Sequence, residues 1–230
     1  MISAFNDPAY RDGVIDLMGL LAYGEISASE RLNADAAMAP DLPTKAEIMQ
    51  MAAAEFGHFL TLRDRLYELG ADPWQIMAEF EPTFERFHRM TQPSDWLEGL
   101  LKAFVGDGMA SDFYREIAAY LDEDNRDIVV DTLSGTGNSQ FVIDRVRAAI
   151  AEDPPISGRL ALWSRRLMGE ALSQAQTLAA EREGLTAVVV GSVDRPSRDV
   201  PSMDFGALAR MFARITDAHA ERMRQLGLDA

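Results

Sequence analysis

Apolar residues recur every three or four positions through most of this chain, which is the spacing of amphipathic α-helices. In the first such segment Val14, Met18, Leu21 and Leu32 fall on one face. The pattern predicts long helices over residues 8–36, 45–69, 94–121, 126–152, 157–184 and 203–227. The short apolar run Leu185–Val190 fits a helix end or a short strand equally well, and the polar residues 191–202 indicate a loop.

Turn and capping residues set the expected boundaries. Thr44, with Glu47 three residues later, predicts a capped start for the second helix, and Gly70 predicts its end. Ser94 is the expected cap of the third helix. Residues 71–93 contain three prolines and several aromatic residues, which indicates a crossover with a short helix.

These elements predict an all-α fold in one domain spanning residues 1–230. No repeat of solenoid length and no second composition regime interrupts the chain. The expected architecture is an antiparallel four-helix bundle with a long crossover between its second and third helices, followed by one or two additional C-terminal helices.

Polar residues interrupt the apolar stripes of three predicted helices. They are Glu25 in the first, Glu55 and His58 in the second, and Asp107 in the third. The turn near residues 39–41 lies about 15 residues from both Glu25 and Glu55, so an antiparallel hairpin would place them at one level. A buried carboxylate needs a partner, and Glu and His one turn apart can bind the same ion. The sequence therefore predicts a metal site formed by Glu25, Glu55, His58 and Asp107.

The fourth predicted helix departs from a complete two-metal arrangement. Di-iron carboxylate bundles use a Glu from each of two helices and a Glu-x-x-His pair from each of the other two. Around the turn near Leu121, position 135 is level with Asp107, but the chain has Gly135 and Asn138 where the second Glu and His would stand. One well-held metal ion, two weakly held ions, or none are the alternatives that this loss leaves open.

Charge and composition argue against several classes of function. The 22 Lys and Arg against 37 Asp and Glu give a formal net charge of −15, which opposes binding to a polyanion such as tRNA. The sequence has no cysteine, which excludes thiolate metal sites, cysteine nucleophiles and disulfides. Since no signal-peptide pattern and no apolar run of about 18 residues occurs, we expect a cytoplasmic protein that does not span a membrane.

Several stretches resemble a known family. They are Met18–Glu25, Met51–His58, Asp95–Asp107 and Gly169–Gln174. They are similar to an actinobacterial branch of the ferritin-like superfamily that resembles the methylthio-isopentenyl-adenosine tRNA hydroxylase. The resemblance implies a non-haem di-iron site that activates O₂, with Glu25, Glu55, His58 and Asp107 as iron ligands. In this chain Asp107 stands where those hydroxylases have Glu.

The sequence leaves three functions open. The first is an O₂-dependent hydroxylase or oxygenase of unknown substrate and redox partner, and the second is a metal-free bundle that acts as a dimeric interaction or structural protein. Iron storage is the least favoured, because the additional C-terminal helices would alter the packing surface of a storage shell. A homodimer is expected, because the last predicted helices have exposed faces.

Other polar residues have secondary predicted roles. Glu170 and Gln174 are candidate partners of the site, and Asp112 and Glu116 are solvated residues or alternative ligands. His88 is expected on the surface of the crossover, and His219 could face the core without a ligand role.

Overall fold

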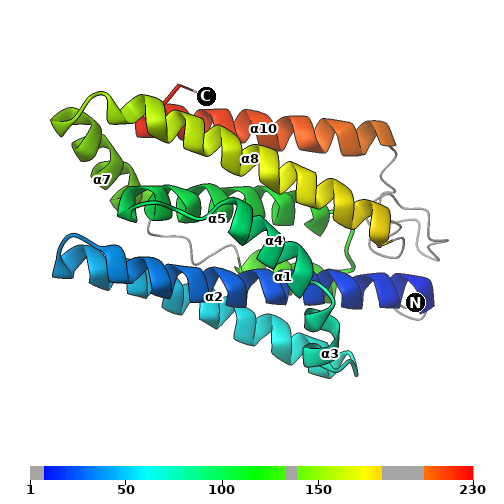
Figure 1. The fold of residues 1–230 in the computed structure, drawn as a ribbon. Coiled ribbons are helices and arrows are strands. Elements are labelled where there is room, and N and C mark those ends of the chain that lie inside the picture. Colours follow the sequence, from blue (N-terminus) through cyan, green and yellow to red (C-terminus); the bar gives the residue numbers. More distant parts are fainter. Residues whose placement is uncertain (1–7, 133–138, 183–204, 230) are drawn as a thin grey trace.

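The computed structural model describes residues 8–132, 139–182 and 205–229, and its first two long helices form an α-helical hairpin. Helix α1 (Pro8–Asp35) and helix α2 (Leu42–Glu68) run antiparallel, joined by the 3₁₀ turn Ala36–Met38 (Figure 1). At 28 residues α1 is roughly 42 Å long, because an α-helix rises about 1.5 Å per residue. The first two predicted helices are thus confirmed.

The start of α2 differs from the prediction. Asp41, not Thr44, is the N-cap, and its carboxylate accepts a hydrogen bond of 2.7 Å from the Thr44 amide. Pro43 lies in the first turn, where its missing N–H needs no partner, so the helix begins earlier than the capping box suggested. The predicted end is confirmed: Gly70 follows the helix with φ 76°, a conformation that favours glycine.

Two short helices form the crossover, α3 (Pro73–Ala78) and α4 (Glu81–Met90), before α5 (Trp96–Ala118). Asp95, not Ser94, caps α5 by accepting a hydrogen bond from the Glu98 amide at 2.9 Å. The Glu98 carboxylate instead accepts hydrogen bonds from the amide and hydroxyl of Ser94. The reciprocal bonding expected at a capping box is therefore present, displaced by one residue.

The single helix expected over 126–152 is wrong. The structure has α6 (Glu123–Asp131) and α7 (Ser139–Glu152), and Asp122 caps α6 through the Asn125 amide. Gly135 and Asn138 lie outside the described residues, as do Leu185–Val190 and the loop predicted over 191–202. Helix α6 ends at Asp131 with Thr132 as its C-cap, shortly before Gly135 and Gly137 in the sequence, and glycine is a poor helix former.

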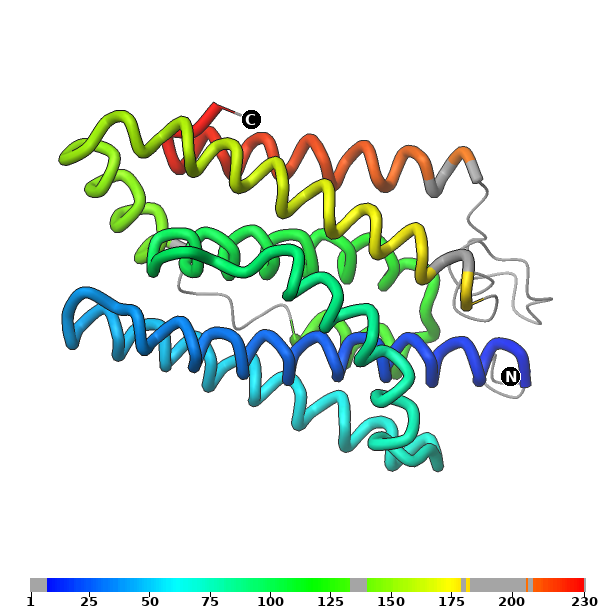
Figure 2. The backbone as a smooth tube through the Cα atoms, viewed as in Figure 1, coloured from blue at the N-terminus to red at the C-terminus, as the bar shows by residue number. Residues whose placement is uncertain are grey.

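The remaining long helices, α8 (Ile156–Glu181) and α10 (Phe205–Leu226), form a second layer. Figures 1 and 2 show α5 between this layer and the α1–α2 hairpin, with α4 passing across the front. Buried apolar side chains of α1, α2 and α5 supply much of the core, and α8 and α10 close it from the other side. The all-α prediction is confirmed, and no helix within the described ranges is long and apolar enough to cross a membrane.

Candidate metal centre

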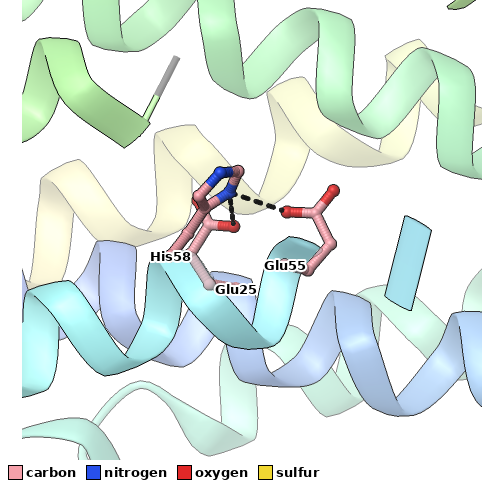
Figure 3. Close-up of side chains that lie close together, drawn as sticks. All are labelled: Glu25, Glu55 and His58. Atoms are coloured by element: carbon pink, nitrogen blue, oxygen red, sulfur yellow. Dashed lines mark ion pairs between the residues drawn. The ribbon is translucent and has the colours of Figure 1, made fainter. Parts of the chain in front are cut away.

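Three of the four predicted ligands meet between α1 and α2. Figure 3 shows the imidazole of His58 between the carboxylates of Glu25 and Glu55. Its Nδ1 lies 3.5 Å from Glu25 Oε2 and 3.4 Å from Glu55 Oε2. One donor atom from each residue can be chosen so that all three lie within 4.8 Å of one another. We call Glu25, Glu55 and His58 the carboxylate–histidine cluster.

The hairpin accounts for this convergence. Glu55 and His58 are one turn apart on α2 and therefore project from the same face. Glu25 comes from the facing side of α1 and is only 6% exposed. Its burial among apolar neighbours would be costly without the histidine, since an unpaired buried charge is strongly destabilising.

Protonation compensates the charges of the cluster when no metal is bound. Hydrogen bonds to Glu25 and Glu55 raise the pKa of His58, so its imidazole holds a proton between the two carboxylates. Burial is the largest cause that raises the pKa of Glu55, and the hydrogen bond from His58 opposes it. The cluster therefore holds protons near neutral pH that a bound cation would have to displace.

Asp107, the fourth predicted ligand, lies on α5 outside the group of three. It lines a cavity that adjoins the cluster, and its carboxyl interacts electrostatically with Glu55 and His58. Burial, followed by the charge of Glu55, raises its pKa to about 7, and His58 and Arg222 oppose the rise. Asp107 thus borders the cluster as a partly protonated carboxyl group.

Tyr114 is a member of the site that the sequence pattern did not identify as functional. It is buried, and its hydroxyl donates a hydrogen bond of 2.7 Å to Glu25 Oε1. Burial and the nearby Glu25 raise the pKa of Tyr114 well above its usual value, so the hydroxyl keeps its proton and remains a donor. The sequence feature that could have identified Tyr114 is its position seven residues after Asp107, which places both residues on the same face of α5.

A cavity of about 570 Å³ adjoins the cluster, within the range of small-molecule sites. Side chains of α1, α2, α4, α5, α8 and α10 line it, and most of them are apolar. Gln174, a predicted partner of the site, is among the lining residues, whereas Glu170 is not.

The predicted surface position of His88 is wrong. The His88 side chain lines the cavity, and its Nε2 lies 2.8 Å from Ser27 Oγ on α1. The amphipathic helix α4 turns this residue inward, because the crossover packs against α1 and α8.

The alternative ligands considered from the sequence have other partners. Asp112 pairs with Arg222 at 2.6 Å, and Glu116 pairs with Arg214 at 2.6 Å. His219 is buried on α10, as expected of a residue facing the core, and it is not part of the carboxylate–histidine cluster.

The donor set fits a divalent transition metal. Carboxylate oxygen and imidazole nitrogen are ligands for iron and manganese, and the two carboxylates would balance the charge of a divalent ion. A Glu on one helix facing a Glu-x-x-His pair on the next is also half of the ligand pattern of di-iron carboxylate bundles. Glu25, Glu55 and His58 can therefore hold one ion after His58 has lost its proton.

Comparisons with known proteins place the chain in a family. No curated protein matches its sequence. Among solved structures, a protein from Synechococcus described as having aldehyde deformylating oxidase activity is similar in fold, with a TM-score of 0.73 and 17% sequence identity. The similarity covers 98% of this chain and 94% of that one. A family model described as a ferritin-like domain of actinomycetes matches residues 8–192, more than three quarters of the sequence. The chain therefore belongs to the ferritin-like domain family of actinomycetes.

Proposed function

We propose that this protein is a non-haem iron oxidoreductase that uses O₂ to hydroxylate an apolar small molecule. The observation that carries the proposal is the position of the carboxylate–histidine cluster beside a large apolar cavity. The ferritin-like fold and the aldehyde deformylating oxidase activity described for the Synechococcus protein support it. The apolar lining and the net charge of −15 favour such a substrate over a nucleic acid.

The reaction needs an external reductant. One oxygen atom of O₂ enters a C–H bond of the substrate, and the other leaves as water after two electrons and two protons have been supplied by a redox partner. Bound iron would supply the O₂ chemistry, and Glu25, Glu55 and His58 would hold it.

The remaining groups of the site have supporting roles. Tyr114 fixes one oxygen of Glu25 by its hydrogen bond, which leaves the other oxygen directed toward His58. Asp107 can accept or release a proton near neutral pH at the edge of the cavity. The apolar walls formed by residues such as Phe84, Leu167 and Ile215 bind the substrate and exclude water.

Oxygen consumption tests this function. The wild type, loaded with Fe(II) without oxygen and supplied with a chemical reductant, is expected to consume O₂ in proportion to its bound iron. Glu55→Gln should lose most of this consumption, because an amide is a weak ligand for iron. Glu116→Gln is the matched control, since Glu116 lies outside the cluster and pairs with Arg214.

A metal-free role remains the second candidate, because the protons shared by His58, Glu25 and Glu55 already satisfy the cluster. In that case Glu55→Leu should be neutral or stabilising, since apolar packing often replaces a buried charge without loss. Equal O₂ consumption by wild type and Glu55→Gln would favour this second role and contradict the first.

A further inference from the structure

A second polar group lies at one end of the cavity, away from the carboxylate–histidine cluster. It comprises Arg31 and Asp35 on α1, His88 on α4 and Lys102 on α5, and all four side chains line the cavity. We call these four residues the polar end of the cavity. Arg31 is six residues beyond Glu25, and Lys102 is five residues before Asp107. The helical rise therefore separates the two groups by about 7.5 to 9 Å along the bundle.

Lys102 is an unusual residue for an apolar cavity. The sequence has only two lysines, Lys45 and Lys102, and Lys102 is 8% exposed. Its Nζ donates one hydrogen bond of 2.8 Å to the Thr91 carbonyl and lies 5.4 Å from the centre of the Phe87 ring. An ammonium group has three donors, so it retains capacity for a ligand.

Two neighbouring nitrogens are buried without a hydrogen-bond partner among the described residues. They are Nε of Arg31 and Nδ1 of His88. The Arg31 guanidinium uses Nη2 to bind Glu85 at 2.8 Å, and His88 uses Nε2 toward Ser27. Buried polar atoms normally have partners, and leaving one unpaired is costly. An acceptor placed here would satisfy Nε of Arg31, and it would also satisfy Nδ1 of His88 in the tautomer in which Nε2 accepts from the Ser27 hydroxyl.

The charges that line this end do not cancel. Arg31 and Lys102 are cations, and Asp35 is the one acidic group beside them on the cavity wall in the described part of the chain. Burial raises the pKa of Asp35, and the charges of Lys102 and Arg31 oppose this rise. Burial also lowers the pKa of His88 to about 3, which keeps that ring neutral. Glu85 and Glu30 pair with Arg31 at 2.8 and 3.7 Å, and neither lines the cavity. Lys102 forms no ion pair with a described residue, so its ammonium group supplies the positive charge available to a ligand at this end.

The opposite end of the cavity is apolar. Beyond the carboxylate–histidine cluster its walls are formed by side chains such as Leu20, Phe113, Leu178, Met211 and Phe212. From Leu20 to Asp35 the lining residues of α1 span 15 positions, roughly 22 Å along the helix. The cavity is thus long, with charge at one end and hydrocarbon at the other.

We infer that the cavity binds a single-chain carboxylate with its head group at Lys102, Arg31 and His88 and its hydrocarbon chain extending past the carboxylate–histidine cluster. This rests on the proposed function in naming its substrate class. In this orientation the cluster faces methylene groups several carbons from the head group, so oxidation would occur within the chain and not at the carboxylate.

Calorimetric titration of the metal-free full-length protein with dodecanoate tests the binding site without iron. Wild type should bind dodecanoate at least tenfold more tightly than dodecan-1-ol of the same chain length. Lys102→Met should lose this preference through at least a tenfold weaker affinity for dodecanoate, with little change for the alcohol. Lys45→Met is the matched control and should bind both compounds as the wild type does, because Lys45 is exposed on α2.

A measurement on the wild type keeps the inference testable even if Lys102→Met fails to fold. With ¹³Cε-labelled lysine only two signals arise, one from each lysine. Dodecanoate should shift the Lys102 signal and leave the Lys45 signal unchanged. Undetectable dodecanoate binding, equal affinity for acid and alcohol, or an unmoved Lys102 signal would overturn the inference. Since iron is absent, such a failure is distinct from failure of the O₂ reaction.

Discussion

Replacing Asp107 with Asn should change how the stability of the metal-free protein depends on pH. Burial raises the pKa of Asp107 from 3.8 to about 7, so the native state holds a proton that the unfolded chain releases between these values. Stability therefore falls as pH rises toward 7, because over that interval the native state binds more protons than the unfolded state. Above pH 7 both states are ionised and this contribution becomes constant.

The expected magnitude follows from the width of that interval. Between pH 5 and pH 8 only the two units from 5 to 7 contribute, and each is worth about 1.36 kcal/mol, which gives roughly 3 kcal/mol. Urea unfolding in the presence of a chelator, at pH 5 and pH 8, should show the wild type losing roughly 3 kcal/mol more than Asp107→Asn. Glu116→Gln should retain the wild-type loss, because Arg214 lowers the pKa of Glu116 and keeps that group ionised across this range. The same pH dependence in wild type and Asp107→Asn would refute the burial assigned to Asp107.

Three further outcomes are expected. Titration with Mn²⁺ should show affinity rising from pH 6 to pH 8 and protons released on binding, because the ligands His58 and Glu55 have raised pKa values and must be deprotonated to bind. An affinity that does not depend on pH would contradict this. Tyr114→Phe should lower the free energy of unfolding by about 1 kcal/mol, measured in urea, through the lost hydrogen bond to Glu25, with metal binding retained. Gly70→Ala should cost about 1 kcal/mol because φ is 76°, whereas Gly169→Ala on α8, where a Cβ meets no atom within 4 Å, should stabilise by about 1 kcal/mol; equal effects would contradict the assigned backbone conformations.

Periodicity was sufficient to predict five of the six expected long helices and the alignment of Glu25 with Glu55 across the hairpin, because both depend on local spacing and on one short turn. The caps at Asp41 and Asp95 were missed by one to three residues, since several neighbouring side chains could accept the same amide. The end of α6 at Asp131 was missed because the apolar residues before and after the glycines continue the helical pattern in the sequence.

The cavity and its polar end could not be predicted in the same way. His88, Lys102 and Arg31 come from three helices, and their approach depends on how the crossover packs across α1 and α5. Lys102 followed by apolar residues resembles an ordinary solvated lysine at a helix edge. The position of Asp35 also depends on tertiary packing. Its carboxylate occupies the space that a Cβ on Gly99 of α5 would fill.

Metal stoichiometry tests the central claim most directly. The protein would be reconstituted with Fe(II) under anaerobic conditions, freed of unbound metal by gel filtration, and measured by elemental analysis. We expect at least one iron per wild-type chain and less than a tenth as much in a Glu25→Gln, Glu55→Gln double variant of unchanged helical content. Equal iron in the two proteins, or none in the wild type, would contradict a metal site at Glu25, Glu55 and His58.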